Sequence, residues 1–345
     1  MDEGAVRWHM EEAACDYCGS SESTPIGQAV DWRYGLEGPY QIVRCQGCGL
    51  VYLNPRPTAA DLPRIYPKAY GPHRVAQSID SDHPRFCLGR ALVEAAKRRL
   101  SQSYYTARKQ GSWLEALGQV AILPIDLYSR MLGHIMYPYP PVNGGRALDV
   151  GCGSGRMLKV LKDLGWEVFG FEPNWAAAVR ARELVGCNIV VGTAPGSSFG
   201  NATFDFIAAS NVLEHTVSPR HMLQELHDML RDGGCLLVVV PNFASVASRV
   251  SGMDWCHLDP PLHLFHFDPR TLRKYLSRSG FQIRRIVCFS EAWALEQTLR
   301  RKYSLDGSSG SEKGALRLAT RVMSGILSFL GKGDILVAHC TKPEA

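Results

Sequence analysis

The sequence predicts an α/β fold in which a parallel sheet alternates with helices, preceded by a small metal-binding segment. Apolar strand-like runs alternate with helical patterns from about residue 144 onward, and the first run ends in closely spaced glycines. Two Cys-x-x-Cys pairs lie near the N-terminus. Parallel strands place ligands at their carboxyl ends, where the candidate site residues of the sheet fall.

The first predicted strand, 147–150, leads into a glycine loop. Gly151, Gly153 and Gly155 allow a tight turn and the close approach of a ligand. A helix follows as far as Gly165, and the second strand, 168–171, ends at Glu172, whose carboxylate can accept hydrogen bonds from ribose hydroxyls. This arrangement predicts a site for a nucleoside cofactor.

Details of the loop favour S-adenosylmethionine over a dinucleotide. Arg156 occupies the position where NAD and FAD sites carry a third glycine, and Asp149 just before the loop would repel a pyrophosphate. S-adenosylmethionine has no phosphates and carries a sulfonium and an ammonium group, which a nearby carboxylate stabilises. The alternative is an accidental glycine-rich turn in an α/β protein.

The elements after the second strand continue the alternation. Asn174 is expected to cap a helix that ends at Gly186, and Ser218 and Asp268, each followed by proline, are expected to begin two more. The remaining strands are predicted at 188–191, 204–209, 235–240 and 335–340.

The two cysteine pairs predict a structural zinc site. Four thiolates suit tetrahedral zinc and leave no open position for catalysis, and a glycine after each pair relieves the tight turn. The alternatives are two disulfides or bound iron. The four expected ligands are Cys15, Cys18, Cys45 and Cys48.

Composition favours a cytoplasmic enzyme. Seven of the eleven cysteines lie outside the pairs without the spacing of a disulfide framework, which indicates a reducing compartment. The N-terminus has neither a basic start nor an apolar run, and no apolar stretch is long enough to span a bilayer. The net charge of only +5 argues against a nucleic-acid partner.

Residues 145–290 resemble the class I S-adenosylmethionine-dependent methyltransferases. The matching pieces are Leu148-Asp149-Val150-Gly151-Cys152-Gly153-Ser154-Gly155, Gly170-Phe171-Glu172-Pro173, Phe204-Asp205-Phe206-Ile207, Asn211-Val212-Leu213-Glu214-His215 and Leu230-Arg231-Asp232-Gly233-Gly234. The resemblance implies a Rossmann-like seven-stranded sheet. With the zinc ribbon in front, the chain is similar to methyltransferases of bacterial natural-product and surface-polysaccharide pathways.

The resemblance also implies roles for residues around the donor. Asp149 and the loop would hold the methionine part, Glu172 the ribose, and Asn211 would border the methyl group. Thr193 and Ala194 stand where the family often has an acidic residue against adenine, so the adenine contacts depart from the usual pattern. The full expected set is Asp149, Gly151, Cys152, Gly153, Gly155, Glu172, Pro173, Thr193, Ala194 and Asn211.

Histidines near the strand ends are the candidate general bases. Histidine suits proton transfer near neutral pH, and the candidates are His215, His263 and His266. Alternatively, Glu214 and His215 brace a helix, and 263–267 is plain packing. Trp255 is a candidate wall of the acceptor pocket, or else a core residue.

The acceptor is expected to be a small or carrier-linked molecule methylated on oxygen. The Asn/Asp-Pro-Pro-aromatic signature of enzymes that methylate base amines is missing, since Ser210-Asn211-Val212-Leu213 stands in its place. The alternatives are an RNA methyltransferase that binds through its zinc ribbon and a catalytically silent scaffold with the cofactor fold.

Three regions are expected along the chain. Residues 1–72 form the zinc ribbon, 73–143 a helical linker or lid, and 144–345 the donor-binding domain with a helical insertion at about 291–331. Helices are predicted at 86–105, 113–136, 292–303 and 315–330, with a mobile Gly/Ser-rich linker at 306–314. The insertions are expected to cover the strand ends as a lid; their amphipathic faces could instead touch a membrane.

Overall fold

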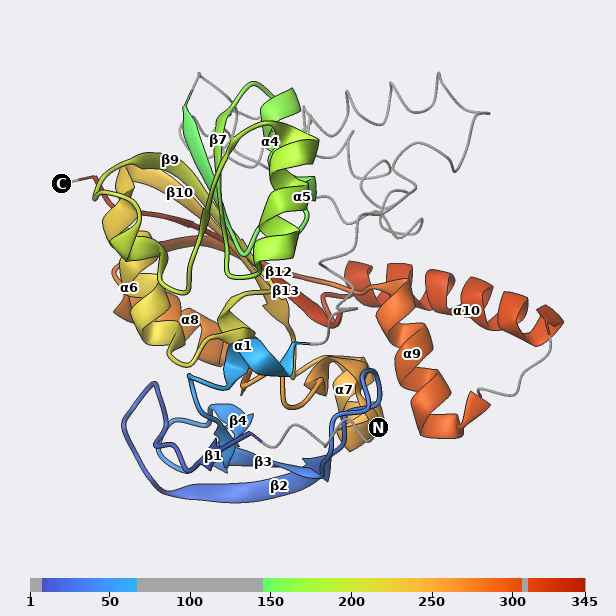
Figure 1. Ribbon diagram of the computed structural model, residues 1–345. Helices are drawn as coiled ribbons and strands as arrows, with labels where there is room; N and C mark the ends of the chain where they lie inside the picture. The colour runs from blue at the N-terminus through green and yellow to red at the C-terminus, as the bar shows by residue number, and fades with distance from the viewer. Residues whose placement is uncertain (1–7, 67–144, 306–309, 345) are drawn as a thin grey trace, which may run out of the picture.

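The computed structural model describes residues 8–66, 145–305 and 310–344, and its centre is a seven-stranded sheet (Figure 1). The strand order is β12-β13-β10-β9-β6-β7-β8. In chain order the strands are β6 (Arg146–Val150), β7 (Glu167–Glu172), β8 (Asn188–Val191), β9 (Phe204–Ser210), β10 (Leu230–Pro241), β12 (Gln282–Phe289) and β13 (Ile335–Thr341).

The sheet is parallel except for its last strand in sequence. β6, β7, β8, β9 and β10 pair in parallel, whereas β13 runs antiparallel between β10 and β12. This confirms the predicted Rossmann-like seven-stranded fold. The strand β12 was not among the predicted strands, and β10 begins at Leu230 rather than 235, with a register shift against β9 between Leu230 and Cys235.

Helices cover both faces of the sheet. Side chains of β10 alternate between two apolar cores, with Val238 in one and Leu237 and Val239 in the other, as expected for a strand buried on both sides. α4 and α5 pack on one face, and α6 and α8 on the other (Figure 1). The longer helices are α4 (Arg156–Asp163), α5 (Trp175–Val185), α6 (Pro219–Met229), α7 (Val246–Ser251), α8 (Pro269–Arg278), α9 (Ala292–Tyr303) and α10 (Gly310–Phe329).

The expected caps begin three of these helices. The side chains of Asn174, Ser218 and Asp268 each accept a hydrogen bond from a backbone N–H of the first turn. α9 spans the predicted range, but α10 begins at Gly310, so the second half of the predicted mobile linker is helical. The predicted helices at 86–105 and 113–136 lie outside the described residues.

A four-stranded antiparallel sheet contains the N-terminal segment and one later strand. Its order is β11-β4-β3-β2, and β11 lies between α7 and α8 in the chain. The bounds are β2 (Ser23–Ala29), β3 (Tyr40–Cys45), β4 (Val51–Leu53) and β11 (Phe265–His266), with the short pair β1 (Met10–Glu11) and β5 (Arg56–Pro57) and the helix α1 (Leu62–Ile65) alongside. One apolar core joins this sheet to α6 and α8.

The helices α9 and α10 connect β12 to β13 at the edge where the parallel strands end. Phe289 of β12 and Pro241 of β10 both pair with Ile335, the first residue of β13. The insertion therefore leaves and re-enters the sheet beside the expected site. Within the described parts of the chain, every helix is too short or too polar to cross a membrane.

Candidate active site and cysteine cluster

The glycine loop is tied to the end of β7 by backbone and side-chain hydrogen bonds. The N–H groups of Gly151 and Cys152 donate to the carbonyl oxygen of Phe171 at 2.8 and 3.1 Å. Glu172 accepts from the Gly153 N–H through Oε2 and from the Asn174 N–H through Oε1, both at 2.8 Å. Glu172 therefore fixes the position of the loop relative to the end of β7.

Glycine is required at two positions of the loop for different reasons. Gly151 has φ +68°, and a Cβ there would lie 2.7 Å from Cγ2 of Val212. Gly155 has φ +84°, and its Cβ would press on Ala181 of α5. The first contact shows that the segment after β9 lies directly against the loop.

Two acidic side chains are buried at the ends of adjacent strands. Burial and the neighbouring charge of Glu172 raise the pKa of Asp149 to about 8, and burial raises the pKa of Glu172. Ionising these two carboxyl groups costs free energy, and a cationic ligand would stabilise their ionised forms. Their environment therefore fits the sulfonium and ammonium groups of S-adenosylmethionine and disfavours a phosphate.

The other expected donor residues follow the same strand ends. Pro173 lies between β7 and α5, while Thr193 and Ala194 lie between β8 and a short 3-10 helix at Pro195–Ser197. Asn211 directly follows β9, has φ +54°, and donates its backbone N–H to the Val239 carbonyl at 2.9 Å. Asparagine tolerates this left-handed conformation better than most residues.

Two of the three candidate histidines meet in a cluster with a buried carboxylate. One ligand atom each of Glu214, His215 and His263 lies within 4.8 Å of the others. The rings of His215 and His263 lie 4.6 Å apart at 84°, and Glu214 is fully buried. Glu214 and His215 belong to the 3-10 turn η3 (Leu213–His215), two residues beyond the Val212 side chain that touches the loop.

Backbone carbonyls orient both histidine rings. Nδ1 of His263 lies 2.8 Å from the His257 carbonyl, and Nδ1 of His215 lies 3.0 Å from the Leu262 carbonyl. Since a carbonyl can only accept, each Nδ1 carries the hydrogen. Burial, with the neighbouring His215 ring, places the pKa of His263 well below its ordinary value, so this imidazole is neutral and can accept a proton at Nε2.

Tyr66 links this cluster to the donor side, although sequence reasoning did not single it out. Its hydroxyl lies 3.1 Å from Nδ1 of His215. Burial and the nearby carboxylates of Glu214 and Glu172 raise the pKa of Tyr66 above its ordinary value. Tyr66 is therefore close enough to Glu214 and Glu172 for their charges to change its pKa.

The third candidate, His266, lies outside the cluster. Its side chain is buried beside Phe243, with ring centroids 5.9 Å apart, and neither ring nitrogen has a hydrogen-bond partner among the described residues. Burial lowers the pKa of His266 to about 3. Trp255 is fully buried and also packs on Phe243, as a core residue does.

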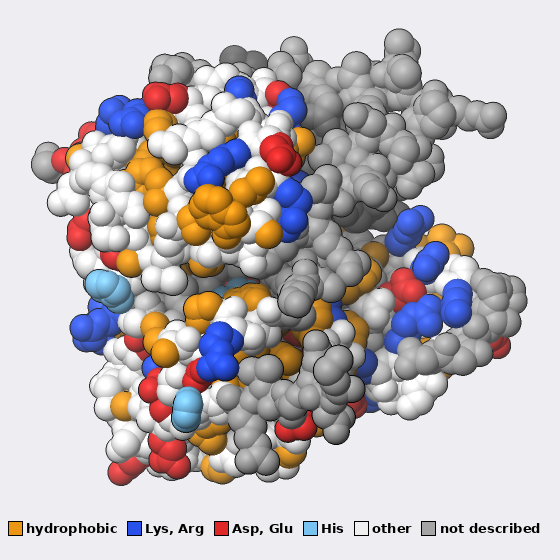
Figure 2. Space-filling view, viewed as in Figure 1, with side chains coloured by type: hydrophobic (Ala, Val, Ile, Leu, Met, Phe, Trp, Pro, Cys, Tyr) orange, Lys and Arg blue, Asp and Glu red, His pale blue; other side chains and the backbone are white. Residues whose placement is uncertain are grey.

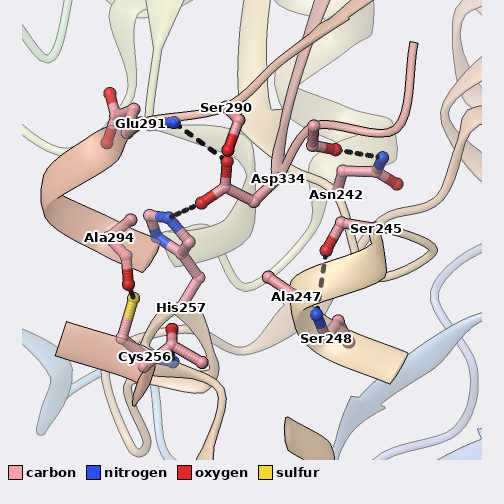
Figure 3. A network of polar contacts seen from close by, with 12 residues as sticks. Asn242, Ser245, Ala247, Ser248, Cys256, His257, Ser290, Glu291, Ala294 and Asp334 are labelled. Carbon is pink, nitrogen blue, oxygen red and sulfur yellow. Dashed lines mark hydrogen bonds and ion pairs between the residues drawn. The ribbon is translucent and has the colours of Figure 1, made fainter. Parts of the chain in front are cut away.

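A second layer of polar contacts holds the segment that carries His263. Asp334, just before β13, lies 3.4 Å from Nε2 of His257 and accepts the Glu291 N–H at 3.0 Å; Figure 3 shows it between these two partners. Burial alone would lower the pKa of His257, but Asp334 outweighs it and raises the pKa. Asp334 thus anchors the residue whose carbonyl orients His263.

The four cysteines of the two pairs come together. Their sulfur atoms lie within 4.8 Å of one another, with Cys15–Cys48 and Cys18–Cys45 each at 3.4 Å. Burial raises the pKa of Cys45, but hydrogen bonds from the Cys48 backbone and the neighbouring thiols outweigh it and lower the pKa to about 7. The glycines after the pairs, Gly19 and Gly49, have the positive φ that the tight turns need.

The comparison with protein families decides the class. The model of the family described as "Methyltransferase domain" matches residues 110–286, just over half of the chain. The chain belongs to the methyltransferase domain family. With its seven-stranded sheet and its single antiparallel strand β13, it is a class I S-adenosylmethionine-dependent methyltransferase.

Two relatives of this methyltransferase carry names that indicate different acceptors. A ubiquinone biosynthesis O-methyltransferase of Azorhizobium caulinodans is 25% identical over 46% of this chain and 67% of its own length. A tRNA U34 carboxymethyltransferase of Methylococcus capsulatus is 29% identical over 69% of this chain and 73% of its own. A methyltransferase solved with the Trm112 activator of Haloferax volcanii is similar at 18% identity and a TM-score of 0.46, covering 64% of this chain and 91% of the solved one.

Proposed function

We propose that this methyltransferase transfers a methyl group to an oxygen atom of a small or carrier-linked acceptor, such as a natural-product or sugar intermediate. The observation that best supports this proposal is the cluster of Glu214, His215 and His263. The cluster follows the carboxyl end of β9, where Val212 contacts the glycine loop. A neutral histidine next to the donor suits the deprotonation of a hydroxyl group. The relatives named as O-methyltransferases add support.

Residues at the carboxyl ends of β6 to β9 are proposed to hold the donor. Asp149 and the loop hold the methionine part, Glu172 the ribose, and Asn211 borders the methyl group. Bound S-adenosylmethionine supplies an electrophilic methyl group on a sulfonium. His263 or His215 accepts the proton of the acceptor's hydroxyl group. The acceptor oxygen forms a bond to the methyl carbon, and the electron pair of the broken carbon–sulfur bond stays on sulfur.

Donor binding and chemistry are tested separately. Calorimetry should show S-adenosylmethionine binding to the wild type and weaker binding to Glu172→Ala. Mass spectrometry of reactions with hydroxylated acceptors should show methyl transfer that His263→Gln slows by about 100- to 10,000-fold without loss of donor binding. The matched control is His221→Gln, because His221 is an exposed residue of α6. No heat with the donor would contradict the proposal.

We further propose that the four-cysteine cluster holds a structural zinc ion and that residues 1–72 act as a zinc ribbon. The geometry of four converging sulfurs supports zinc over two separate disulfides, since every sulfur has partners from the other pair. Metal analysis of the purified chain, before and after Cys18→Ser, tests this.

A second candidate is methylation of RNA, favoured by a basic groove. The groove, about 680 Å³ in volume, lies between α8 and the first cysteine pair and is lined by Tyr17 and by Arg270, Arg273, Lys274 and Arg278. Elsewhere, positive and negative side chains are interspersed over the face that Figure 2 views. RNA binding that weakens steeply with salt and is reduced by Arg270→Glu would favour this candidate.

A further inference from the structure

We propose that the outer face of α10 docks on the surface of an anionic lipid bilayer. This inference goes beyond the proposed function, because it concerns where the enzyme works and not the atom that it methylates. The docking face, called here the α10 stripe, consists of apolar side chains of α10 and of the residue after it: Leu318, Val322, Met323, Ile326, Phe329 and Leu330.

The α10 stripe directs its apolar side chains away from the protein. All six are between 45% and 66% exposed. With about 3.6 residues per turn, positions 318, 322, 326 and 329 recur on one side of the helix. An amphipathic helix on the surface of a globular protein normally turns such a row toward the core. The orientation of α10 is the reverse, which indicates an apolar partner outside the chain.

The inner face of α10 is made mainly of small hydroxyl residues. Thr320, Ser324 and Ser328 are at most 4% exposed. Each hydroxyl donates to a carbonyl oxygen of the same helix, at 3.0, 2.9 and 2.7 Å respectively. Ser328 also accepts the Ser290 N–H at 2.9 Å, which ties α10 to the segment after β12. The inner face is therefore satisfied against α9 and the sheet without the large apolar side chains of the stripe.

Positive charge accompanies the stripe. Between residues 292 and 332 the sequence has seven Lys and Arg but only three Asp and Glu. Lys313, Arg317, Arg321 and Lys332 lie on α10 or shortly after it, whereas the one acidic residue of α10 is in its first turn. Figure 2 shows Lys and Arg side chains gathered over α9 and α10 on the face that it views. An apolar row beside basic residues matches an anionic bilayer, whereas two copies of this basic face would repel each other.

Docking through the stripe would be peripheral. Among the described residues no helix is long and apolar enough to cross a membrane. A helix with an apolar outer row and flanking basic residues lies in the plane of the interface instead. α9 and α10 leave the sheet at Phe289 and return at Ile335, where the parallel strands end. One pair of helices would therefore connect the bilayer to the edge of the sheet that carries the donor residues.

Vesicle sedimentation of the full-length wild type tests this proposal. The chain should sediment with vesicles of phosphatidylglycerol and phosphatidylcholine in equal parts, and bind vesicles of phosphatidylcholine alone at least about tenfold more weakly. Absence of binding to the anionic vesicles would overturn the proposal. Analytical ultracentrifugation then distinguishes what covers the stripe instead: a dimer points to a second copy, and a monomer to residues 67–144 of the same chain.

Variants of the stripe identify the surface that binds. Leu318→Gln combined with Ile326→Gln should weaken binding to anionic vesicles at least about tenfold, because less apolar area enters the bilayer. The matched control combines Val160→Gln with Leu184→Gln, which changes exposed apolar side chains of α4 and α5, and should bind as the wild type does. Equal binding by the stripe variant and the wild type would overturn the proposal.

The electrostatic part has its own variant. Arg321→Gln combined with Lys332→Gln should weaken binding to the anionic vesicles by about tenfold and leave binding to phosphatidylcholine unchanged. Calorimetry with S-adenosylmethionine should give the wild-type affinity in the stripe and charge variants, which shows that their fold is intact. An equal preference for anionic vesicles in the charge variant and the wild type would overturn the role of these cations.

Discussion

Asp149 links the protonation state of the site to donor binding. The pKa of Asp149 is raised to about 8, so near neutral pH the free protein holds this carboxyl group mostly protonated. A cationic donor binds the ionised form better. Its affinity should therefore rise with pH between 6 and 8, by at most about tenfold per unit for one linked proton.

Calorimetry from pH 6 to 7.5 checks this prediction. Asp149→Asn should bind S-adenosylmethionine more weakly at pH 7.5 and lose the pH dependence. If the affinity for S-adenosylmethionine changes with pH equally in the wild type and in Asp149→Asn, a group other than Asp149 causes the pH dependence.

His266 is expected to limit stability in acid. A neutral histidine with pKa about 3 in the folded state and about 6.5 when unfolded contributes stability that is present above pH 6.5 and lost as the pH falls toward 3. His266→Leu removes two unpartnered nitrogens and should raise the free energy of unfolding by about 1 kcal/mol at pH 7, and by more at pH 5. Urea unfolding of the wild type and His266→Leu at pH 7 and pH 5 measures the gain in unfolding free energy at each pH. The same pH dependence of stability in both proteins would show that His266 is not responsible for the loss in acid.

Single residues show where sequence reasoning ends. Asp149, the glycines and Glu172 were predicted because their roles depend on neighbours close in the chain. Glu214 was read only as a possible brace, because its burial depends on distant segments. Tyr66 reaches His215 across 149 positions of sequence, and no local pattern signals such a contact.

At the scale of elements, helix starts were predictable and strand pairing was not. Proline at the first helical turn and a capping side chain before it are local signals, and all three expected caps form. β12 carries charged residues at Arg284 and Arg285 and lies at the edge of the sheet, so its apolar pattern is weak. The pairing of β11 with β4 joins residues more than two hundred positions apart.

The capping box of α8 should contribute measurably to stability. Asp268 accepts from the Thr271 N–H at 2.7 Å, and the Thr271 hydroxyl lies 2.9 Å from the Asp268 N–H. Asp268→Ala should lower the free energy of unfolding by about 1 kcal/mol. In the control, Asp163→Ala breaks only an exposed pair with Lys159 in α4 and should change it by less than about 0.5 kcal/mol. Urea unfolding measures the free energy of unfolding of both variants. An equal loss in Asp268→Ala and Asp163→Ala would contradict a stabilising role for the capping box.

At the scale of the molecule, the cysteine segment is coupled to the cluster through the backbone. The Leu53 N–H of β4 donates to the Leu264 carbonyl at 2.9 Å, and the Leu264 N–H donates to the Glu214 carbonyl at 2.7 Å. The zinc ion proposed above would order β3 and β4 through Cys45 and Cys48, and these hydrogen bonds would extend that order to Leu264 and Glu214.

Cys45→Ser should loosen this connection. Amide hydrogen exchange at Leu53 and Leu264 should speed up and methyl transfer should fall, while donor binding at the glycine loop should change little. Cys187→Ser, which alters a half-buried cysteine outside the cluster, serves as the control. Unchanged exchange at Leu264 in Cys45→Ser would show that the two parts are uncoupled.

The sheet completed by β11 also bears on synthesis. β4 ends at Leu53, and its partner at Phe265 and His266 leaves the ribosome more than two hundred residues later. At about 5 to 20 residues per second this is a delay of roughly 10 to 40 s, during which the outer edge of β4 has no strand to pair with. A nascent chain of this methyltransferase would therefore benefit from chaperones that cover this edge, or from fast translation of the second half, which shortens the delay.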